Sequence, residues 1–338
     1  MTTKSIGITF LAIILLSGCK TKAYEYTKVA GFAQGTTYHI TYENKKGKDY
    51  KADIDKMLND FNKSLSIWDS ASIISRINRN EPTVETDDWF EASYKKSVEI
   101  NRLSDGAFDI TVGPVVRAWG FSNLPYAKHD STYIDSLKQF VGMDKIQLKK
   151  HHLIKSIPGV QLDMNGLAQG YSVDVVCRFF DHQGIKNYMV EIGGEVRAKG
   201  KNGSGKLWKI GVDKPVDDNM DPGKMLEAVI ELDNKSVSTS GNYRKFYIEN
   251  GVKYSHTIDP KTGRPAHNTL LSATVVAPDC ITADALATAF MVMGVEKGKE
   301  FLKKLPGVDV LFIYSDSQGN MKVYTSEGMN KRVVEIAK

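Results

Sequence analysis

Four short segments of the chain concentrate residue types that could carry out chemistry, and the last of them is the most specific. Asp284 and Thr288 stand four residues apart, so on a helix they share one face. A carboxylate and a hydroxyl offer only oxygen atoms, which suits Mg²⁺, an ion that keeps waters and substrate phosphate oxygens in its other positions. The alternative is an Asp and a Thr that satisfy backbone groups near a helix N-terminus.

A second segment, residues 162–171, passes from an acid through a glycine turn into a predicted helix. Asp163 precedes the turn at Gly166, and the helix is expected to begin near Ala168. Backbone N–H groups at such a helix start, together with the helix dipole, favour an anion such as a pyrophosphate. An Asp helix cap followed by a turn glycine explains the same residues equally well.

The other two segments combine turns with aromatic, hydroxyl and imidazole side chains. Residues 105–114 form a turn sequence that leads to Trp119 and Phe121. Residues 238–243 are rich in hydroxyls, and His256 stands just before the turn sequence Asp259–Gly263. A histidine in that place, with clustered hydroxyls upstream, is less easily explained by a turn alone.

Hydrophobic periodicity predicts the elements that must position these segments. We expect helices over 50–65, 89–103, 168–183, 282–293 and 296–305. Strands are expected over 36–42, 187–192, 195–198, 207–212, 226–232, 246–248 and 271–276, with a hairpin from 308–314 to 321–324. Because helices and strands mix without strict βαβ alternation, the sequence favours an α+β fold over a doubly wound parallel sheet. No Pro- or Gly-rich linker divides the chain, so we expect one catalytic domain, with room for two lobes.

The N-terminus carries an export signal. The apolar run over 6–16, about 11 residues, matches a signal-peptide core and is too short to cross a bilayer as a helix. It ends in Leu16-Ser17-Gly18-Cys19, which resembles a bacterial lipobox. We therefore expect a lipoprotein signal peptide over 1–18, a tether over 19–28 that begins at a lipidated Cys19, and a folded domain over 29–338. An ordinary secretory signal is the alternative.

Composition and cysteine spacing exclude several other classes of protein. The chain has 338 residues with 45 Lys and Arg against 40 Asp and Glu, and the scattered lysines give no reason to expect a nucleic-acid partner. Cys177 and Cys280 lie outside any metal-binding spacing, so they are expected as two separate buried thiols, although export would permit a disulfide. Residues 200–206 match the start of a phosphate loop, but Leu207 replaces the Ser or Thr that meets Mg²⁺ and a strand follows, so a hairpin turn is expected.

The order and content of these segments resemble the ApbE family of bacterial FAD:protein FMN transferases. The resemblance covers nearly the whole mature chain, and it is carried by Gly106–Asp109, Asp163–Gly170, Ile192–Glu195, Thr239–Gly241, His256–Gly263 and Ala283–Thr288. It implies an ApbE-like α+β domain that moves the FMN half of FAD onto a Thr or Ser hydroxyl of a target protein and releases AMP. It also implies Mg²⁺ as cofactor and, as acceptor, an exported or membrane redox protein. Many members are exported lipoproteins, so the resemblance and the lipobox together imply a lipid-anchored protein on a bacterial membrane, facing the periplasm.

The same resemblance implies roles for individual residues. Asp284, Thr288 and the backbone carbonyl of Gly166 would hold Mg²⁺. His256 would take the proton of the acceptor hydroxyl, with Asp163 as its rival for that role. Gln34 and Gln169 stand where the family often has Met and a charged residue, respectively. The residues that would line the FAD site are Gln34, Trp68, Ala107, Phe108, Asp109, Asp163, Gln169 and Ile258.

Two other functions use the same residues or a subset of them. A FAD pyrophosphatase would let water replace the protein hydroxyl and would give FMN and AMP. A non-catalytic exported FAD-binding lipoprotein would need neither the metal pair nor the histidine, yet Asp284, Thr288 and His256 are all present.

Overall fold

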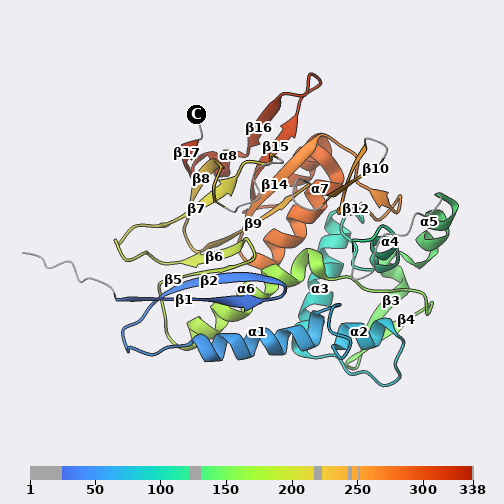
Figure 1. Ribbon diagram of the computed structural model, residues 1–338, viewed down its shortest axis with the longest axis horizontal. Coiled ribbons are helices and arrows are strands. Elements are labelled where there is room, and N and C mark those ends of the chain that lie inside the picture. The colour runs from blue at the N-terminus through green and yellow to red at the C-terminus, as the bar shows by residue number, and fades with distance from the viewer. Residues whose placement is uncertain (1–24, 122–130, 217–222, 243–245, 250–251, 337–338) are drawn as a thin grey trace, which may run out of the picture.

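An eight-stranded antiparallel sheet organises the chain, in the strand order β1-β2-β5-β6-β9-β14-β15-β16 (Figure 1). The computed structural model describes residues 25–121, 131–216, 223–242, 246–249 and 252–336. The strands of this sheet are β1 (Tyr26–Ala33), β2 (Thr36–Glu43), β5 (Tyr188–Ile192), β6 (Glu195–Lys199), β9 (Lys235–Gly241), β14 (Leu270–Ala277), β15 (Asp309–Ser315) and β16 (Met321–Thr325). Neighbouring strands such as β6 and β9 are far apart in sequence, so the sheet forms only when distant segments of the chain pair.

Smaller sheets complete the β-structure. A three-stranded sheet has the order β17-β8-β7, from β7 (Trp208–Asp213), β8 (Leu226–Leu232) and β17 (Val333–Ile336). Three two-stranded pairs join β3 (Ile146–Lys149) to β4 (His152–Lys155), β10 (Phe246–Glu249) to β11 (Val252–Ser255), and β12 (Ile258–Asp259) to β13 (Arg264–Pro265).

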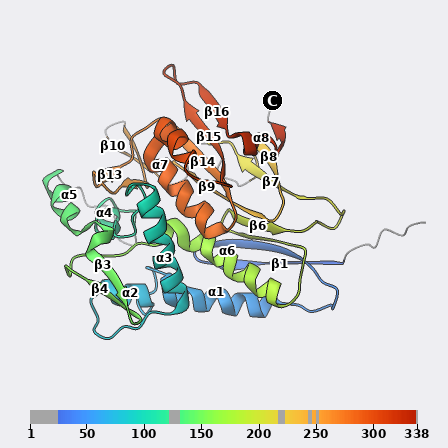
Figure 2. The ribbon, with the colours of Figure 1, turned by 180° about the vertical axis from the view of Figure 1, so that it is seen from behind.

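Helices cover one face of the large sheet, and the three-stranded sheet packs on the other. The helices are α1 (Lys51–Leu65), α2 (Ile73–Asn78), α3 (Asp88–Leu103), α4 (Gly113–Ala118), α5 (Ser131–Leu137), α6 (Asn165–His182), α7 (Cys280–Leu302) and α8 (Glu327–Asn330). Figure 2 shows α6 and α7 lying across the sheet, where they contact β5, β6, β9 and β14. On the opposite face Val196 and Ala198 of β6 join a core cluster with Trp208 and Ile230 of the smaller sheet.

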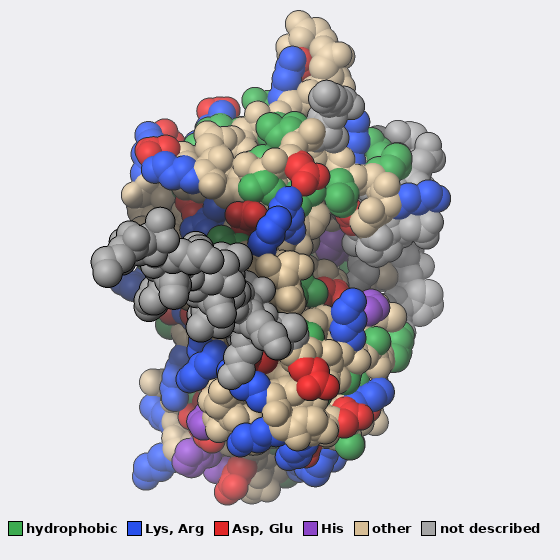
Figure 3. All heavy atoms as spheres, turned by 90° about the vertical axis from the view of Figure 1, so that its left-hand side faces the viewer, with side chains coloured by type: hydrophobic (Ala, Val, Ile, Leu, Met, Phe, Trp, Pro, Cys, Tyr) green, Lys and Arg blue, Asp and Glu red, His purple; other side chains and the backbone are tan. Residues whose placement is uncertain are grey.

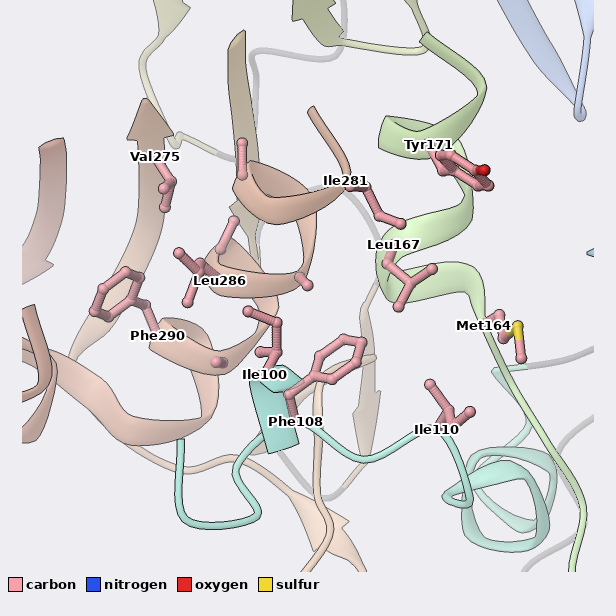
Figure 4. Close-up of a cluster of buried hydrophobic side chains, with 14 of the residues drawn as sticks. Ile100, Phe108, Ile110, Met164, Leu167, Tyr171, Val275, Ile281, Leu286 and Phe290 are labelled. Carbon is pink, nitrogen blue, oxygen red and sulfur yellow. The ribbon is translucent and has the colours of Figure 1, made fainter. Parts of the chain in front are cut away.

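The main hydrophobic core lies between α7, α6, α3 and the large sheet. Figure 4 shows Phe290 and Leu286 of α7 beside Val275 of β14, with Phe108 pointing from its loop toward α6 and α7. These side chains are almost fully buried. The core therefore fixes the loop that precedes α4 against the two central helices.

Helices α6 and α7 run antiparallel and touch one helical turn after another. A Cβ added to Gly166 would lie 3.2 Å from the Thr288 Oγ1, and one added to Gly170 would lie 2.7 Å from the Asp284 Cβ. One turn further, Asp174 accepts hydrogen bonds from the backbone N–H groups of Cys280 and Ile281, each at 2.9 Å. Glycines at two of these contacts allow the backbones to approach this closely.

Helix α7 is interrupted at Gly294, where the backbone turns to φ 74°. This is the left-handed region that glycine adopts without steric cost. The Asn268 side chain donates a hydrogen bond to the Met291 carbonyl at 2.9 Å and so satisfies one of the last carbonyls before the break. The two helices that the sequence predicts on either side of Gly294 are therefore confirmed.

Most of the predicted elements are present, and the α+β class is confirmed. The sequence did not predict the short elements α2, α4, α5, α8, β3, β4, β12, β13 and β17, and three further differences concern boundaries and pairing. Helix α6 begins at Asn165, earlier than expected, and β1 begins at Tyr26, inside the expected tether. The expectation of a hairpin at residues 200–206 is wrong, because this turn joins β6 of the large sheet to β7 of the three-stranded sheet. Cys177 and Cys280 are buried free thiols, as expected.

The surface mixes charges of both signs. On the face shown in Figure 3, Lys and Arg side chains lie among Asp and Glu side chains. No helix within the described ranges combines the length and apolar character needed to cross a membrane.

The close contact at Gly170 predicts the effect of a single methyl group. In an exposed helix interior Gly→Ala adds about 1 kcal/mol to stability. Gly170→Ala should instead lower the free energy of unfolding by about 1–3 kcal/mol, because the new Cβ meets the Cys280 carbonyl and Asp284. Urea denaturation measures the change. Gly203→Ala is the control, since its Cβ would make only ordinary contacts with Tyr26; equal stability of the two variants would contradict the close approach.

Candidate functional site

The contact between α6 and α7 brings together the residues that could hold a cation. Asp284 and Thr288 lie on one face of α7, directed at the first two turns of α6. The Gly170 N–H donates to the Asp284 Oδ2 at 2.9 Å, and the Thr288 hydroxyl lies against Gly166. Asp284 is 6% exposed. A carboxylate, a hydroxyl and a nearby backbone carbonyl form an oxygen-only donor set, which fits Mg²⁺.

The electrostatics of this corner favour a cation. Burial raises the pKa of Asp284 to about 7, and the Gly170 N–H offsets only part of that rise. The carboxyl group of Glu195, at the start of β6, is also buried. Burial and the neighbouring Asp284 charge together raise the pKa of Glu195 well above its usual range. Two acids in such surroundings ionise together only when a positive charge joins them.

The first turn of α7 is held by Asp174 of α6. Its Oδ2 accepts from the two backbone N–H groups of Cys280 and Ile281, and its Oδ1 accepts from the Arg197 Nη1 at 2.6 Å. The Asp174 side chain is 5% exposed and that of Arg197 is 26% exposed, so the carboxylate is buried and the ion pair is shielded from water on one side. The arrangement satisfies N–H groups that a helix start leaves without partners, and it sets where Asp284 lies along α6.

The residues on both sides of α4 meet the turn that follows His256. The Trp119 Nε1 donates to the Gly263 carbonyl at 2.8 Å, and the Lys261 Nζ pairs with Asp105 at 2.7 Å. Beside the second contact lies an open pocket of about 440 Å³ whose lining includes Gly106, Asp109 and Lys261. Residues 105–114 and the turn at 259–263 thus form one wall of the candidate site, and the α6–α7 contact forms the second.

Asp109 is fixed within this wall. Its Oδ1 accepts from the Thr111 N–H at 2.7 Å and from the Thr111 hydroxyl at 2.5 Å. Burial raises the pKa of Asp109, and the hydrogen bonds from Thr111 oppose that rise. The neighbouring Ala107 and Phe108 are buried, and Phe108 lies 3.1 Å from a Cβ placed on Gly166. Phe108 therefore links this wall to the α6–α7 contact.

The two candidate bases occupy different surroundings. His256 lies edge-on to Phe121, with ring centroids 6.3 Å apart, beside the cluster that contains the buried Ile258. Asp163 donates its backbone N–H to the Ile110 carbonyl at 2.7 Å, and its Oδ1 accepts from the Asn165 N–H at 2.9 Å. Asp163 stands one residue before the N-cap residue Met164, and its side chain accepts the N–H of the first residue of α6, so it acts at the helix start as the cap alternative expects.

Gln34 and Gln169 both lie between α6 and the turns that join β1 to β2 and β5 to β6. The Ser172 hydroxyl donates to the Gln34 Oε1 at 3.3 Å, and the Gln34 Nε2 is buried without a partner among the described residues. The Gln169 side chain packs against Gly193, in the turn between β5 and β6. Gln169 is the residue before Gly170, and Gln34 contacts Ser172, two residues after Gly170. Both amide side chains therefore lie near the turn of α6 that bonds to Asp284.

Trp68 lies apart from the two walls. Its side chain is 62% exposed, and it lines a second pocket of about 580 Å³ with Arg79, Arg117 and Gln161. Gln161 stands two residues before Asp163, so this pocket adjoins the start of α6. Cys19 lies outside the described residues.

Sequence spacing singled out Asp284 and Thr288, and the family resemblance added Gly166 and Asp109. Neither assigned a role to Glu195, Asp174 or Arg197. Glu195 belongs to a segment quoted for the family resemblance, and its burial beside Asp284 depends on a tertiary contact. The signal that could have found it is an acid directly after a Gly-Gly turn, at the start of a strand otherwise facing the core.

Comparison with known proteins gives a consistent result. A model of the ApbE family matches residues 34–312. The FAD:protein FMN transferase of Vibrio cholerae is 37% identical over 94% of this chain and 96% of its own length, and that of Haemophilus influenzae is 36% identical over 92% and 93%. Two solved structures have a TM-score of 0.81. They are the flavin transferase ApbE from Vibrio cholerae, 36% identical over 91% of this chain and 99% of the other, and apo flavinyl transferase ApbE from Pseudomonas stutzeri, 29% identical over 91% and 97%.

We expect the two ion pairs between β6 and α6 to contribute unequally to the free energy of unfolding. Asp174→Ala should lower the free energy of unfolding by about 3–5 kcal/mol, since it leaves Arg197 and two N–H groups without partners. Lys199→Met removes the more exposed pair with Asp181 and should cost below about 1 kcal/mol. Thermal and urea unfolding of both variants measure the difference, and similar losses would show that Asp174 does not hold α7.

Proposed function

The chain belongs to the ApbE family, and we propose that this FAD:protein FMN transferase moves FMN from FAD to a Thr or Ser hydroxyl of an exported or membrane redox protein, in a Mg²⁺-dependent reaction that releases AMP. The observation that carries the proposal is the α6–α7 contact. It gathers the Asp284 carboxylate, the Thr288 hydroxyl and Gly166 within a buried corner beside Phe108 and Asp109.

The transfer forms one bond and breaks another at the FMN phosphorus of FAD. The acceptor oxygen bonds to that phosphorus, the bond to the bridging oxygen breaks, and AMP leaves with that oxygen. Bound Mg²⁺ supplies charge neutralisation to the diphosphate, which phosphoryl transfer needs more than covalent help. Asp284, Thr288 and the Gly166 carbonyl would hold it.

The chain's own residues align the reactants and take the proton. His256 and Asp163 are the two groups suited to accept the proton of the acceptor hydroxyl. Asp163 already accepts the Asn165 N–H at 2.9 Å, and an imidazole is the side-chain base best suited to proton transfer near neutral pH, which favours His256.

The FAD site would extend over both walls described above. Asp109 offers a fixed carboxylate at the pocket of about 440 Å³. Ala107, Phe108 and Ile258 are buried next to this wall and would contribute apolar contacts. Gln34, Gln169 and Asp163 would contact FAD around the start of α6. The exposed Trp68 ring offers a flat surface for an aromatic group beside that helix start.

We further propose that the protein is exported and anchored through a lipid on Cys19, on a bacterial membrane and facing the periplasm. The support is the sequence Leu16-Ser17-Gly18-Cys19 after a short apolar run. The folded domain begins at Tyr26, so a few residues would separate the domain from the anchor.

Removal of the Asp284 carboxylate tests the transferase proposal. Wild-type protein given FAD, Mg²⁺ and a Thr-containing acceptor peptide should release AMP and add the mass of FMN to the peptide. Asp284→Ala should lower both rates by at least about 100-fold, because the charge on the diphosphate is no longer neutralised. Chromatography of AMP and mass spectrometry of the peptide give the two rates.

Glu296→Ala is the matched control, because it removes an exposed acid from the same helix and should keep full activity. AMP release with no modified peptide would support the pyrophosphatase instead. Unchanged FAD that stays tightly bound would support the non-catalytic FAD-binding lipoprotein. Full activity of Asp284→Ala would show that Asp284 is not a ligand of the metal.

A cysteine substitution tests the anchor. Cys19→Ala should move the protein from the membrane fraction of expressing bacteria to a soluble fraction or leave its signal peptide uncleaved. Cys177→Ala, which changes a buried thiol, should remain in the membrane fraction. Immunoblots of the fractions report the outcome. A Cys19→Ala protein that stays on the membrane with the mobility of the wild type would rule out lipidation at this residue.

A further inference from the structure

Charged residues of β6 face the helices at every second position. Lys199 pairs with Asp181 of α6 at 2.8 Å, and Arg197 pairs with Asp174 of α6 at 2.6 Å. The alternate residues Val196 and Ala198 face the three-stranded sheet. Side chains alternate across a strand, so the next position on the helix side is Glu195.

Glu195 breaks this series of charge pairs. Arg197 and Lys199 each place a cation of β6 opposite an acid of α6. Glu195 instead places a second acid near Asp284. Glu195 is 8% exposed. Its Oε1 accepts from the Ser238 hydroxyl at 3.3 Å, while its Oε2 is buried and has no hydrogen-bond partner among the described residues.

Contacts around the β5–β6 turn explain why Glu195 reaches the cation site. Gly193 lies against the Gln169 side chain, and the next residue of α6, Gly170, donates its N–H to Asp284. Val196, which follows Glu195, accepts a hydrogen bond from the Cys280 thiol at 3.7 Å, at the start of α7. Glu195 is therefore enclosed by α6, α7 and β9.

The corner holds two buried carboxyl groups and, among the described side chains, no cation paired with either of them. A buried carboxylate without a partner is costly, and a bound dication is the species that can offset two of them at once. The pairing along β6 shows that the fold supplies Lys or Arg where it neutralises an acid internally, and here it does not.

We propose that Glu195 is a positioning residue of the cation site, whose carboxyl group acts with Asp284 to hold a divalent cation at Asp284 and Thr288. The inference rests on the proposed function, because it assumes that a cation binds there. Groups just beyond the ligands of a metal typically change its affinity by about 10–100-fold when they are replaced.

Glu195→Gln tests the role of this carboxyl group, because it keeps the shape of the side chain and a hydrogen-bond acceptor. Mn²⁺ serves as the probe, and electron paramagnetic resonance of free Mn²⁺ gives the Kd of the full-length protein without FAD. Glu195→Gln should raise this Kd by about 10-fold or more. The thermal midpoint of the metal-free variant should stay at or above that of the wild type, since a buried acid has been removed.

Glu191→Gln is the control, with the same change of charge in the same hairpin. Glu191 pairs with His39 at 2.8 Å and accepts the Gly194 N–H at 2.8 Å, and it lies on the face of the sheet opposite to Asp284, so its replacement should leave the Mn²⁺ Kd within about twofold. A Glu195→Gln Kd that also stays within about twofold would overturn the inference. A lowered thermal midpoint with unchanged Mn²⁺ affinity would show a structural role only.

Ser238→Ala provides a second test of the proposal if Glu195→Gln does not fold. This variant removes the hydroxyl that orients Glu195 and should weaken Mn²⁺ binding in the same direction. Unchanged Mn²⁺ affinity in a folded Ser238→Ala, when Glu195→Gln cannot be obtained, would count against the inference. Wild-type protein that binds no Mn²⁺, or Asp284→Ala that binds as tightly as the wild type, would contradict the metal assignment itself and thus the proposed function.

Discussion

The antiparallel contact between α6 and α7 is the constraint on which the rest of this structure depends. It requires glycine at residue 170, because a side chain there would meet the backbone of α7, and it leaves little room for one at Gly166. It also requires Asp174 to bind the first N–H groups of α7. These contacts recur one turn apart, so they fix both the spacing and the rotation of the helices. Thr288 and Asp284 consequently face the start of α6 rather than the lipophilic core around Phe290.

Two acids on these helices illustrate how the same burial serves different purposes. Asp174 has partners on both oxygens, Arg197 on one and two N–H groups on the other, so it stabilises the contact of α6 with β6 and α7. Asp284 receives a single N–H bond, and burial raises its pKa. The fold thus keeps one carboxyl group satisfied and leaves the neighbouring one in need of a positive charge. That contrast separates residues that support the site from those that bind within it.

Local patterns predicted the parts of the structure that local physics determines. Helical spacing placed Asp284 and Thr288 on one face, and Gly294 marked the end of the first half of α7. The turn at residues 200–206 was also recognised, but its partner strands were not, because strand pairing depends on distant segments. Glu195 could not be placed for the same reason: it meets Asp284 only after β6, β9 and both helices have assembled. The family resemblance supplied residue roles that spacing alone left open, such as that of His256.

The break at Gly294 divides α7 into two helical segments. Asn268 closes the first by bonding to the Met291 carbonyl, and Phe301 of the second packs against Phe290 of the first. A continuous helix would transmit an insertion as a rotation of about 100° per added residue to every residue beyond it. Because the helical phase ends at Gly294, an insertion after the break would not rotate the turn that carries Asp284 and Thr288.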